Sequence, residues 1–322
     1  MKKRAVSSLL AILAVVSFIL PALATEPGEE TEIEETSAQD SAEETEPESA
    51  IFLDGVSQPL EYEILNGTTY VTVASFVAVM DPEAVVEEEN GVATVSSARV
   101  EEIVDDEAED PANVEVGTAD DEIGTANVVQ ETLSMTVSDG ARYIVANSRY
   151  LYAQDGVIML NDRVAAPIRA LAKVFNLGVD YDAEAKAILL NHVEDAGAYL
   201  QPGDSYYNED TLFWLSRIIY AESGNQILDG KIAVGNVVMN RVESPQFPNN
   251  IYDVLNQKNQ FSPASSLSKK TPNSQSELAA KLVMDGAQVV PSALFFARAG
   301  MSCYASRNRT YVTTIGAHAF YA

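Results

Sequence analysis

The chain has 322 residues and a formal net charge of -28, and its charged side chains are unevenly distributed. Residues 205–322 contain 8 Asp or Glu and 10 Lys or Arg, whereas the preceding residues contain 40 acidic and 10 basic side chains. So acidic a chain lacks the basic surface that neutralises phosphates, which argues against nucleic acid as a partner. Its single cysteine excludes an intramolecular disulfide.

Residues 1–24 have the pattern of a secretory signal peptide. Lys2, Lys3 and Arg4 precede an apolar core from Leu9 to Leu20, and Ala22-Leu23-Ala24 supplies a small-x-small cleavage site. The apolar core is shorter than the roughly 20 residues that span a membrane, and no longer apolar run follows. The sequence therefore predicts a secreted, extracytoplasmic protein with no membrane span after signal removal.

Two acidic segments flank a more apolar region. Residues 25–50 are rich in Glu, Thr, Ser and Ala and contain no Lys or Arg, which predicts a disordered acidic linker. Residues 99–132 contain the runs Asp105-Asp106-Glu107 and Asp120-Asp121-Glu122 and are predicted to be an insertion. Residues 196–204, with two glycines and a proline, read as a further linker.

Residues 51–195 contain an internal repeat, with one unit at 51–98 and the other at 133–192. Each unit shows a strand pattern, a short helix and a two-strand hairpin. The run Arg163-Val164-Ala165-Ala166-Pro167-Ile168-Arg169-Ala170-Leu171-Ala172 is the best match in a pattern that resembles the domain shared with the N-terminal region of copper amine oxidases. This resemblance implies a stalk or adhesion role with possible wall or protein contacts. It implies no copper chemistry, because His192 is the domain's only histidine.

Glu222 stands where an amphipathic helical pattern stops. Leu212, Leu215, Ile218 and Ile219 recur at helical spacing, Asp210 is a plausible N-cap and Gly224 a plausible C-terminal stop. An ionised carboxylate is disfavoured at the negative end of a helix dipole and among apolar neighbours. Such a carboxylic acid suits the protonation of a leaving oxygen, and a solvated glutamate at a helix end is the alternative.

The rest of residues 205–322 predicts an α-rich α+β module. Helices are expected at about 229–242, at 251–255 and at 276–289, and short strands at 294–296 and 311–315. The fold class predicted for the whole chain is therefore α+β, with a small repeated domain followed by this module.

Five ordered segments of the module resemble the spore-cortex-lytic cell wall hydrolases. They are Arg217 to Glu222, Gly230 to Val242, Phe247 to Tyr252, Asn259-Gln260-Phe261-Ser262, and Ala293 to Phe296 with Thr313 to Tyr321. The resemblance implies a lysozyme-like fold, action on peptidoglycan glycan strands in the cell wall or spore, and Glu222 as the catalytic residue. Ser223-Gly224-Asn225, Ala297 and Ala317 depart from the family's usual pattern.

Substrate contacts are predicted at Gln260, Phe261 and Ser262, with further contacts at Tyr311 and His318. Phe261 is equally well interpreted as a core residue, and His318 as a structural, hydrogen-bonded histidine. No metal and no cofactor are expected, because a zinc amidase needs three His or carboxylate ligands and the module has one histidine.

Two outcomes of glycan cleavage are possible. A lysozyme needs a second carboxylate, and the candidates Asp229, Glu243, Asp253, Glu277 and Asp285 stand in no recognisable motif; Asp229 reads as a helix cap. A lytic transglycosylase needs only one Glu as acid and then base, and this is the preferred hypothesis. The alternative class is a non-catalytic wall-binding or germination-regulating protein with a degenerate site.

Overall fold

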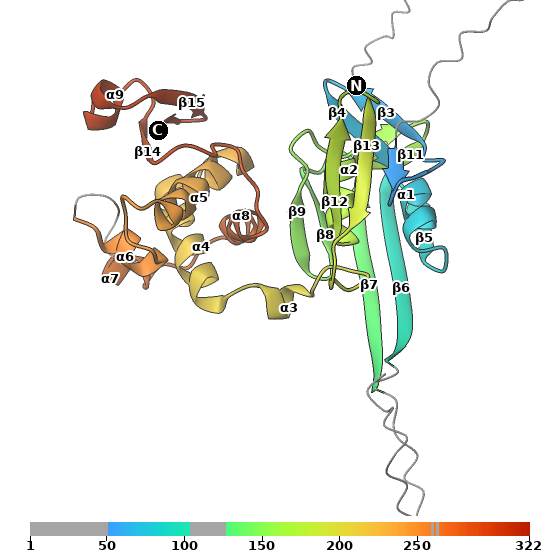
Figure 1. The fold of residues 1–322 in the computed structure, drawn as a ribbon. Coiled ribbons are helices and arrows are strands. Elements are labelled where there is room, and N and C mark those ends of the chain that lie inside the picture. Colours follow the sequence, from blue (N-terminus) through green and yellow to red (C-terminus); the bar gives the residue numbers. More distant parts are fainter. Residues whose placement is uncertain (1–50, 104–126, 259–260, 262–263) are drawn as a thin grey trace, which may run out of the picture. The chain divides into compact units, whose positions relative to one another are not determined.

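The computed structural model describes residues 51–103, 127–258, 261 and 264–322 (Figure 1). The predicted signal peptide and acidic linker, most of the predicted insertion, and Gln260 and Ser262 lie outside the described residues. In the described part of the chain, no helix is both long and apolar enough to cross a membrane.

The region before residue 193 consists mostly of short strands around two short helices. In chain order the elements are β1 (Ile51–Leu53), β2 (Val56–Ser57), β3 (Tyr62–Leu65), β4 (Thr68–Thr72), α1 (Val73–Met80), β5 (Val85–Glu89), β6 (Val92–Ile103), β7 (Asn127–Ser138), β8 (Tyr143–Ala146), β9 (Arg149–Tyr152), β10 (Ile158–Leu160), β11 (Arg163–Pro167), α2 (Ile168–Val174), β12 (Leu177–Asp182) and β13 (Ala187–His192).

The two strand–helix–hairpin units share their sheets. β4 of the first unit pairs antiparallel with β11 of the second, with Thr72 opposite Ala165. β1 pairs parallel with β13, with Ile51 opposite Ile188. The remaining strands form a five-stranded sheet in the order β5-β6-β7-β8-β9. In this third sheet β6 of the first unit pairs with β7 of the second. Because strands from both units pair within all three sheets, neither unit completes these sheets alone.

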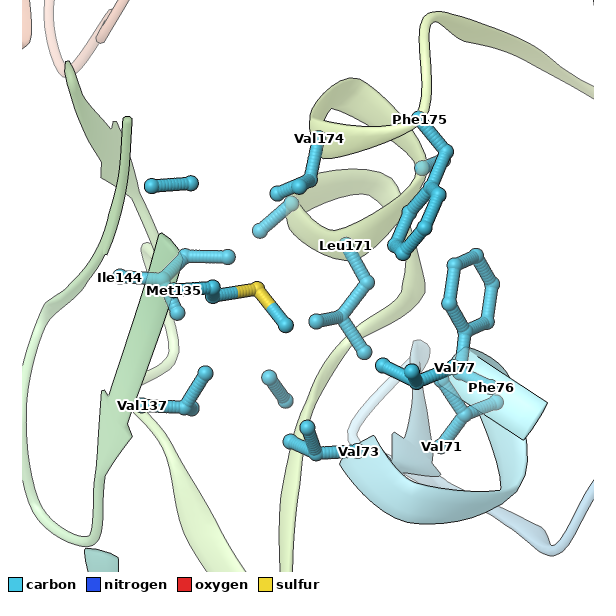
Figure 2. Close-up of a cluster of buried hydrophobic side chains, with 14 of the residues drawn as sticks. Val71, Val73, Phe76, Val77, Met135, Val137, Ile144, Leu171, Val174 and Phe175 are labelled. Carbon is cyan, nitrogen blue, oxygen red and sulfur yellow. The ribbon is translucent and has the colours of Figure 1, made fainter. Parts of the chain in front are cut away.

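One apolar core joins the two units (Figure 2). Helices α1 and α2 bury side chains spaced three or four residues apart, as one face of a helix requires. They meet Met135 and Val137 of β7 and Ile144 of β8, all fully buried or nearly so. Phe76 and Phe175 pack with their ring centroids 5.8 Å apart. Burial of these large side chains supplies the main stabilisation of the repeat region.

Two boundaries differ from those predicted from the sequence. Residues 99–103 and 127–132, which were assigned to the acidic insertion, extend β6 and β7, and Ile103 pairs with Asn127. The predicted linker 196–204 contains Tyr199 and Leu200, which are buried in the core of the repeat region. Both segments have a polar composition. Nevertheless, strand pairing extends into the predicted insertion, and the apolar core includes part of the predicted linker.

The region after residue 202 is mainly helical. Its elements are α3 (Gly203–Tyr206), α4 (Glu209–Ser223), α5 (Leu228–Glu243), α6 (Ile251–Asn256), α7 (Ala264–Leu267), α8 (Ser274–Met284), β14 (Phe295–Arg298), α9 (Tyr304–Asn308), β15 (Tyr311–Ile315) and β16 (His318–Tyr321). The three strands form an antiparallel sheet in the order β14-β16-β15. The predicted α+β class is confirmed by this mixture of helices and sheets.

Helix α5 is the central helix of this module. It is buried on almost all sides, and a Cβ built on Gly235 would lie 2.9 Å from Val283 of α8 and 3.0 Å from Ile219 of α4. Glycine therefore permits three helices to meet closely at this point. The buried Asn236 donates to the carbonyl of Ala287 at 2.7 Å, which fixes the chain that follows α8.

The observed ends of the helices differ in several details from those predicted from the sequence. Asn208, not Asp210, is the N-cap of α4, and its side chain accepts a hydrogen bond from the Thr211 amide at 2.9 Å. Helix α8 ends at Met284 and not near residue 289, because Gly286 takes a left-handed φ of 87°. Gly224 is the C-cap of α4 as predicted, but its φ of -53° is right-handed.

Candidate active site

Glu222 lies half-buried in the last turn of α4. The buried face formed by Leu215, Ile218 and Ile219 packs into the helical core and fixes the rotation of α4 about its axis. That rotation determines on which side of α4 the Glu222 side chain lies. The histidine of β16, His318, is close enough for its titration to depend on the charge of Glu222. The structure thus brings together two residues that lie far apart in the sequence.

The loop after Glu222 is tied to the turn that precedes His318. The side-chain oxygen of Gln226 accepts a hydrogen bond from the Ala317 amide at 2.9 Å. Gly316 has a φ of 56°, and a Cβ at this position would lie 2.3 Å from the same Gln226 oxygen. Only glycine fits both the left-handed backbone and this close approach. The bond links the end of α4 to the β15–β16 hairpin, a role that the sequence did not reveal.

His318 packs among aromatic rings. Its ring stands edge-on to Phe296, with centroids 5.3 Å apart, and to Phe320 at 6.3 Å. Burial lowers the pKa of His318 from its ordinary value, and the negative charge of Glu222 partly offsets this effect. Its Nδ1 is buried and makes no hydrogen bond. The interpretation of His318 as a hydrogen-bonded structural histidine is therefore wrong for this nitrogen.

Glu222→Gln is expected to lower the pKa of His318 further, because the substitution removes the negative charge that raises it. Titration of the imidazole resonances of His318 by NMR measures this shift without any substrate. Glu277→Gln, which removes an exposed carboxylate from the first turn of α8, is the matched control and should leave the titration unchanged. An unchanged or higher pKa in Glu222→Gln would show that the two side chains do not interact.

Phe261 joins the same aromatic group. Its ring centroid lies 6.3 Å from that of Phe296, so Phe261 and His318 share one neighbour. The Arg241 guanidinium of α5 lies 4.7 Å from the Phe261 ring, and its Nε donates to the Leu294 carbonyl at 2.7 Å. Phe261 is partly buried against the helical core, as its interpretation as a core residue requires, and its contact with substrate stays a prediction.

Arg241 is a buried cation held by rings instead of carboxylates. Only 3 % of its surface is exposed, and its guanidinium also faces Phe247 and Phe295 at 5.0 and 5.4 Å. Burial lowers the pKa of Arg241 to about 10. Cation–π contacts of this kind are stronger when water is excluded. Arg241 therefore holds Phe261, Phe247 and β14 together on one side of α5.

The other predicted substrate contacts have different positions. Tyr311 is 57 % exposed at the start of β15, and its hydroxyl donates to Thr314 at 3.0 Å. Its ring packs edge-on against Tyr321 at 6.0 Å. The structure does not describe Gln260 and Ser262, so their roles stay predictions.

Two candidates for a second catalytic carboxylate are engaged elsewhere. Asp229 accepts hydrogen bonds from the Tyr152 hydroxyl at 2.8 Å and from Arg142 at 3.2 Å. Burial and this bond raise the pKa of Tyr152 to about 12, so Tyr152 stays a donor. Ile227, not Asp229, is the N-cap of α5, and the reading of Asp229 as a helix cap is wrong.

Asp285 is the more completely engaged of the two. Its side chain is fully buried at the end of α8, where Arg149 binds it through Nε at 2.8 Å and through a second nitrogen at 2.5 Å. The Tyr207 hydroxyl and the Tyr150 amide donate to its other oxygen. Glu243, Asp253 and Glu277 are exposed. Asp285 is thus a structural carboxylate.

Among the residues that the structure describes, no group of three or more His, Cys, Asp or Glu side chains is arranged to hold a metal ion. A cavity of about 800 Å³ is lined by residues that include Tyr62, Arg169, Tyr181 and the candidate carboxylate Asp285. Neither Glu222 nor His318 lines this cavity. This cavity is therefore not part of the candidate site around Glu222.

Comparison with known proteins supports the assignment of the module. Residues 225–321 match the family model described as Cell Wall Hydrolase, and this match begins three residues after Glu222. No curated protein matches the chain.

Two solved structures are similar to part of the chain. One is the catalytic domain of the Bacillus cereus SleB protein, at 25% identity over 36% of this chain and 92% of that chain, with a TM-score of 0.34. The other is the catalytic domain of the germination-specific lytic transglycosylase SleB from Bacillus anthracis, at 25% identity over 38% of this chain and 100% of that chain, also with a TM-score of 0.34. The resemblance predicted from the sequence is thus confirmed for residues 225–321, which match the cell wall hydrolase family model.

Proposed function

We propose that this protein degrades peptidoglycan by cleaving the glycosidic bond between N-acetylmuramic acid and N-acetylglucosamine, with Glu222 as the single acid and base. The observation that carries the proposal is the position of Glu222. It is half-buried at the end of α4, next to the aromatic group around His318, and immediately precedes the cell wall hydrolase segment. A partly desolvated carboxyl beside a ring-lined surface suits proton transfer to a sugar oxygen.

The reaction needs two proton transfers and no metal. The protonated Glu222 carboxyl gives its proton to the glycosidic oxygen, and the bond from that oxygen to the anomeric carbon of muramic acid breaks. The resulting carboxylate then takes the proton from the muramic 6-hydroxyl, whose oxygen bonds to the anomeric carbon. The products are a 1,6-anhydromuramoyl end and a free glucosamine 4-hydroxyl, and Glu222 is protonated again.

The engagement of Asp229 and Asp285 supports the single-glutamate route. A hydrolase with two carboxylates needs the second one within about 5–9.5 Å of the first, free to act as nucleophile or base. Asp285 is fully buried and bound by Arg149 and Tyr207, so it is not available for this role. Asp229 is held by Tyr152 and Arg142.

Substrate binding is assigned to aromatic and polar side chains of the module that contains Glu222. Phe261 and the exposed Tyr311 offer ring faces for stacking against sugars, and Gln260, Ser262 and His318 supply polar contacts. The N-terminal sequence pattern supports secretion, so the proposed substrate is extracytoplasmic cell wall or spore peptidoglycan. The repeat region is proposed to contact the wall or another protein.

Digestion of purified peptidoglycan in oxygen-18-labelled water tests the route. Transglycosylation should give anhydromuropeptides without the label, because no water enters the product. A hydrolase would give reducing ends that carry the label, and this result would contradict the single-glutamate route while preserving glycan cleavage. EDTA should not change the rate, since no step uses a metal.

The same digestion distinguishes an enzyme from a non-catalytic wall-binding protein. A protein that binds peptidoglycan and releases no products, under conditions in which a control muramidase digests the substrate completely, would be a wall-binding protein with a degenerate site. Cortex and vegetative peptidoglycan used in parallel show which material is the better substrate.

A further inference from the structure

Lys231 is a buried lysine near the start of α5 that the proposed reaction does not use. Only 2 % of its surface is exposed. Its ammonium donates to the Ser223 carbonyl at 2.8 Å and to the Gly224 carbonyl at 2.7 Å. These are the two carbonyls that follow Glu222 at the end of α4. In the described part of the chain, no ion pair joins Lys231 to a carboxylate.

The end of α4 needs such a partner. The last carbonyls of a helix lack intrahelical donors and carry a partial negative charge. A left-handed glycine after the helix often supplies amide donors to them, but Gly224 has a φ of -53° and continues the right-handed turn. A Cβ at Gly224 would lie 2.6 Å from the Tyr220 carbonyl, so the chain is closely packed at this point. Lys231 therefore provides the cap from a neighbouring helix.

The burial of Lys231 is unfavourable by itself. Burial lowers the pKa of its ammonium. Surface lysines avoid this cost by keeping the ammonium in water. Lys231 differs from a surface lysine because its ammonium is bonded to the carbonyls of the two residues that follow Glu222.

We propose that Lys231 is a positioning residue for Glu222, which holds the backbone of the turn that follows Glu222 and places a positive charge at the carbonyl end of α4. The proposal rests on the proposed function of Glu222. After the first proton transfer, Glu222 must persist as a carboxylate at the negative end of α4 before it acts as base. A fixed ammonium at that end offsets the unfavourable potential.

The neighbouring elements contribute other groups to this end of α4. His318 approaches from β16, and the neutral Asn273 at the start of α8 donates to the Gly224 carbonyl at 3.5 Å. The bond between Gln226 and Ala317 fixes the same loop on its other side. Among these groups, Lys231 is the cation bonded to the helix end itself.

The test compares Lys231→Gln, which keeps hydrogen-bond donors without the charge, with Lys231→Met, which removes both. Lys186→Gln, at an exposed position in the repeat region, makes the same change in net charge and is the control. On purified peptidoglycan, both Lys231 variants should lose about ten- to hundred-fold in kcat, the range expected when a catalytic group is slightly misplaced, with KM changed by less than about twofold. The alkaline limb of the pH profile should move to higher pH in both.

Two further measurements keep the outcomes distinct. Melting temperatures and circular dichroism show whether each variant is folded, and the rates are compared at a temperature where all are. The carboxyl carbon resonance of Glu222 reports the position of this side chain without turnover, and its chemical shift should change in both Lys231 variants and not in Lys186→Gln. A folded Lys231→Gln with the wild-type kcat, pH profile and carboxyl resonance would overturn the proposal. Wild-type protein that releases no glycan products would instead overturn the proposed function, and the carboxyl resonance would still decide the role of Lys231.

Discussion

Glu222→Gln should reduce glycan cleavage at least about 10³-fold, because one residue supplies both proton transfers and each such contribution is typically 10²- to 10⁴-fold. The amide matches the carboxyl in size, so α4 and its buried face should remain folded. Mass spectrometry of the soluble muropeptides released from peptidoglycan measures the loss, and a zymogram of the two proteins gives the same comparison on intact wall material.

Asp253→Asn is the matched control for this substitution. Asp253 is an exposed carboxylate of the same module, in the first turn of α6, and its side chain accepts a hydrogen bond from Asn250 at 2.8 Å. The control should keep the wild-type rate within about twofold, since surface substitutions away from the site rarely perturb a protein strongly. A Glu222→Gln protein that retains more than a tenth of the wild-type rate would show that another group is the acid.

Asp285→Ala should destabilise the protein by about 3–5 kcal/mol, because it leaves the buried Arg149 guanidinium without its partner. The carboxylate also accepts from the Tyr207 hydroxyl and the Tyr150 amide, and these donors lose their partner as well. Urea denaturation followed by tryptophan fluorescence measures the change, because the single tryptophan, Trp214, lies in α4.

Glu277→Ala provides the comparison within the same helix. Glu277 is exposed in the first turn of α8, so its removal should change the free energy of unfolding by less than about 0.5 kcal/mol. Equal stability of the two variants would mean that the ion pair of Asp285 with Arg149 contributes nothing. Wild-type activity per folded molecule in Asp285→Ala would confirm that this carboxylate takes no part in catalysis.

Local sequence patterns predicted much of the secondary structure. The hairpin predicted after the helix of the first unit is present, because β5 and β6 pair around a turn at Asn90-Gly91 in which both residues take positive φ values. The parallel pairing of β1 with β13 was not predictable in this way, because its partners are far apart in the sequence and their register depends on the shared core. Tyr199 shows the same limit, since a linker composition did not reveal its burial.

The candidate site was predictable only in part. Glu222 stood out because an apolar helical face stops next to it, which is a local feature. The role of Asp229 was missed because its partners Arg142 and Tyr152 lie far upstream, and a lone aspartate at a helix start resembles a cap. Lys231 was missed although its partners, Ser223 and Gly224, lie close to it in the sequence. The sequence indicates the negative end of α4, but only the fold shows that the Lys231 ammonium is bonded to it.

The pairing of Ile103 with Asn127 has a consequence for how this protein can vary. The chain leaves β6 and returns to β7 at one point, so the sheet is indifferent to the length of what joins them. Loop closure costs only about 0.6 kcal/mol for each doubling of length. A change in the length of the connection should therefore cost little in strand pairing, and an experimenter can insert a fluorescent reporter between β6 and β7.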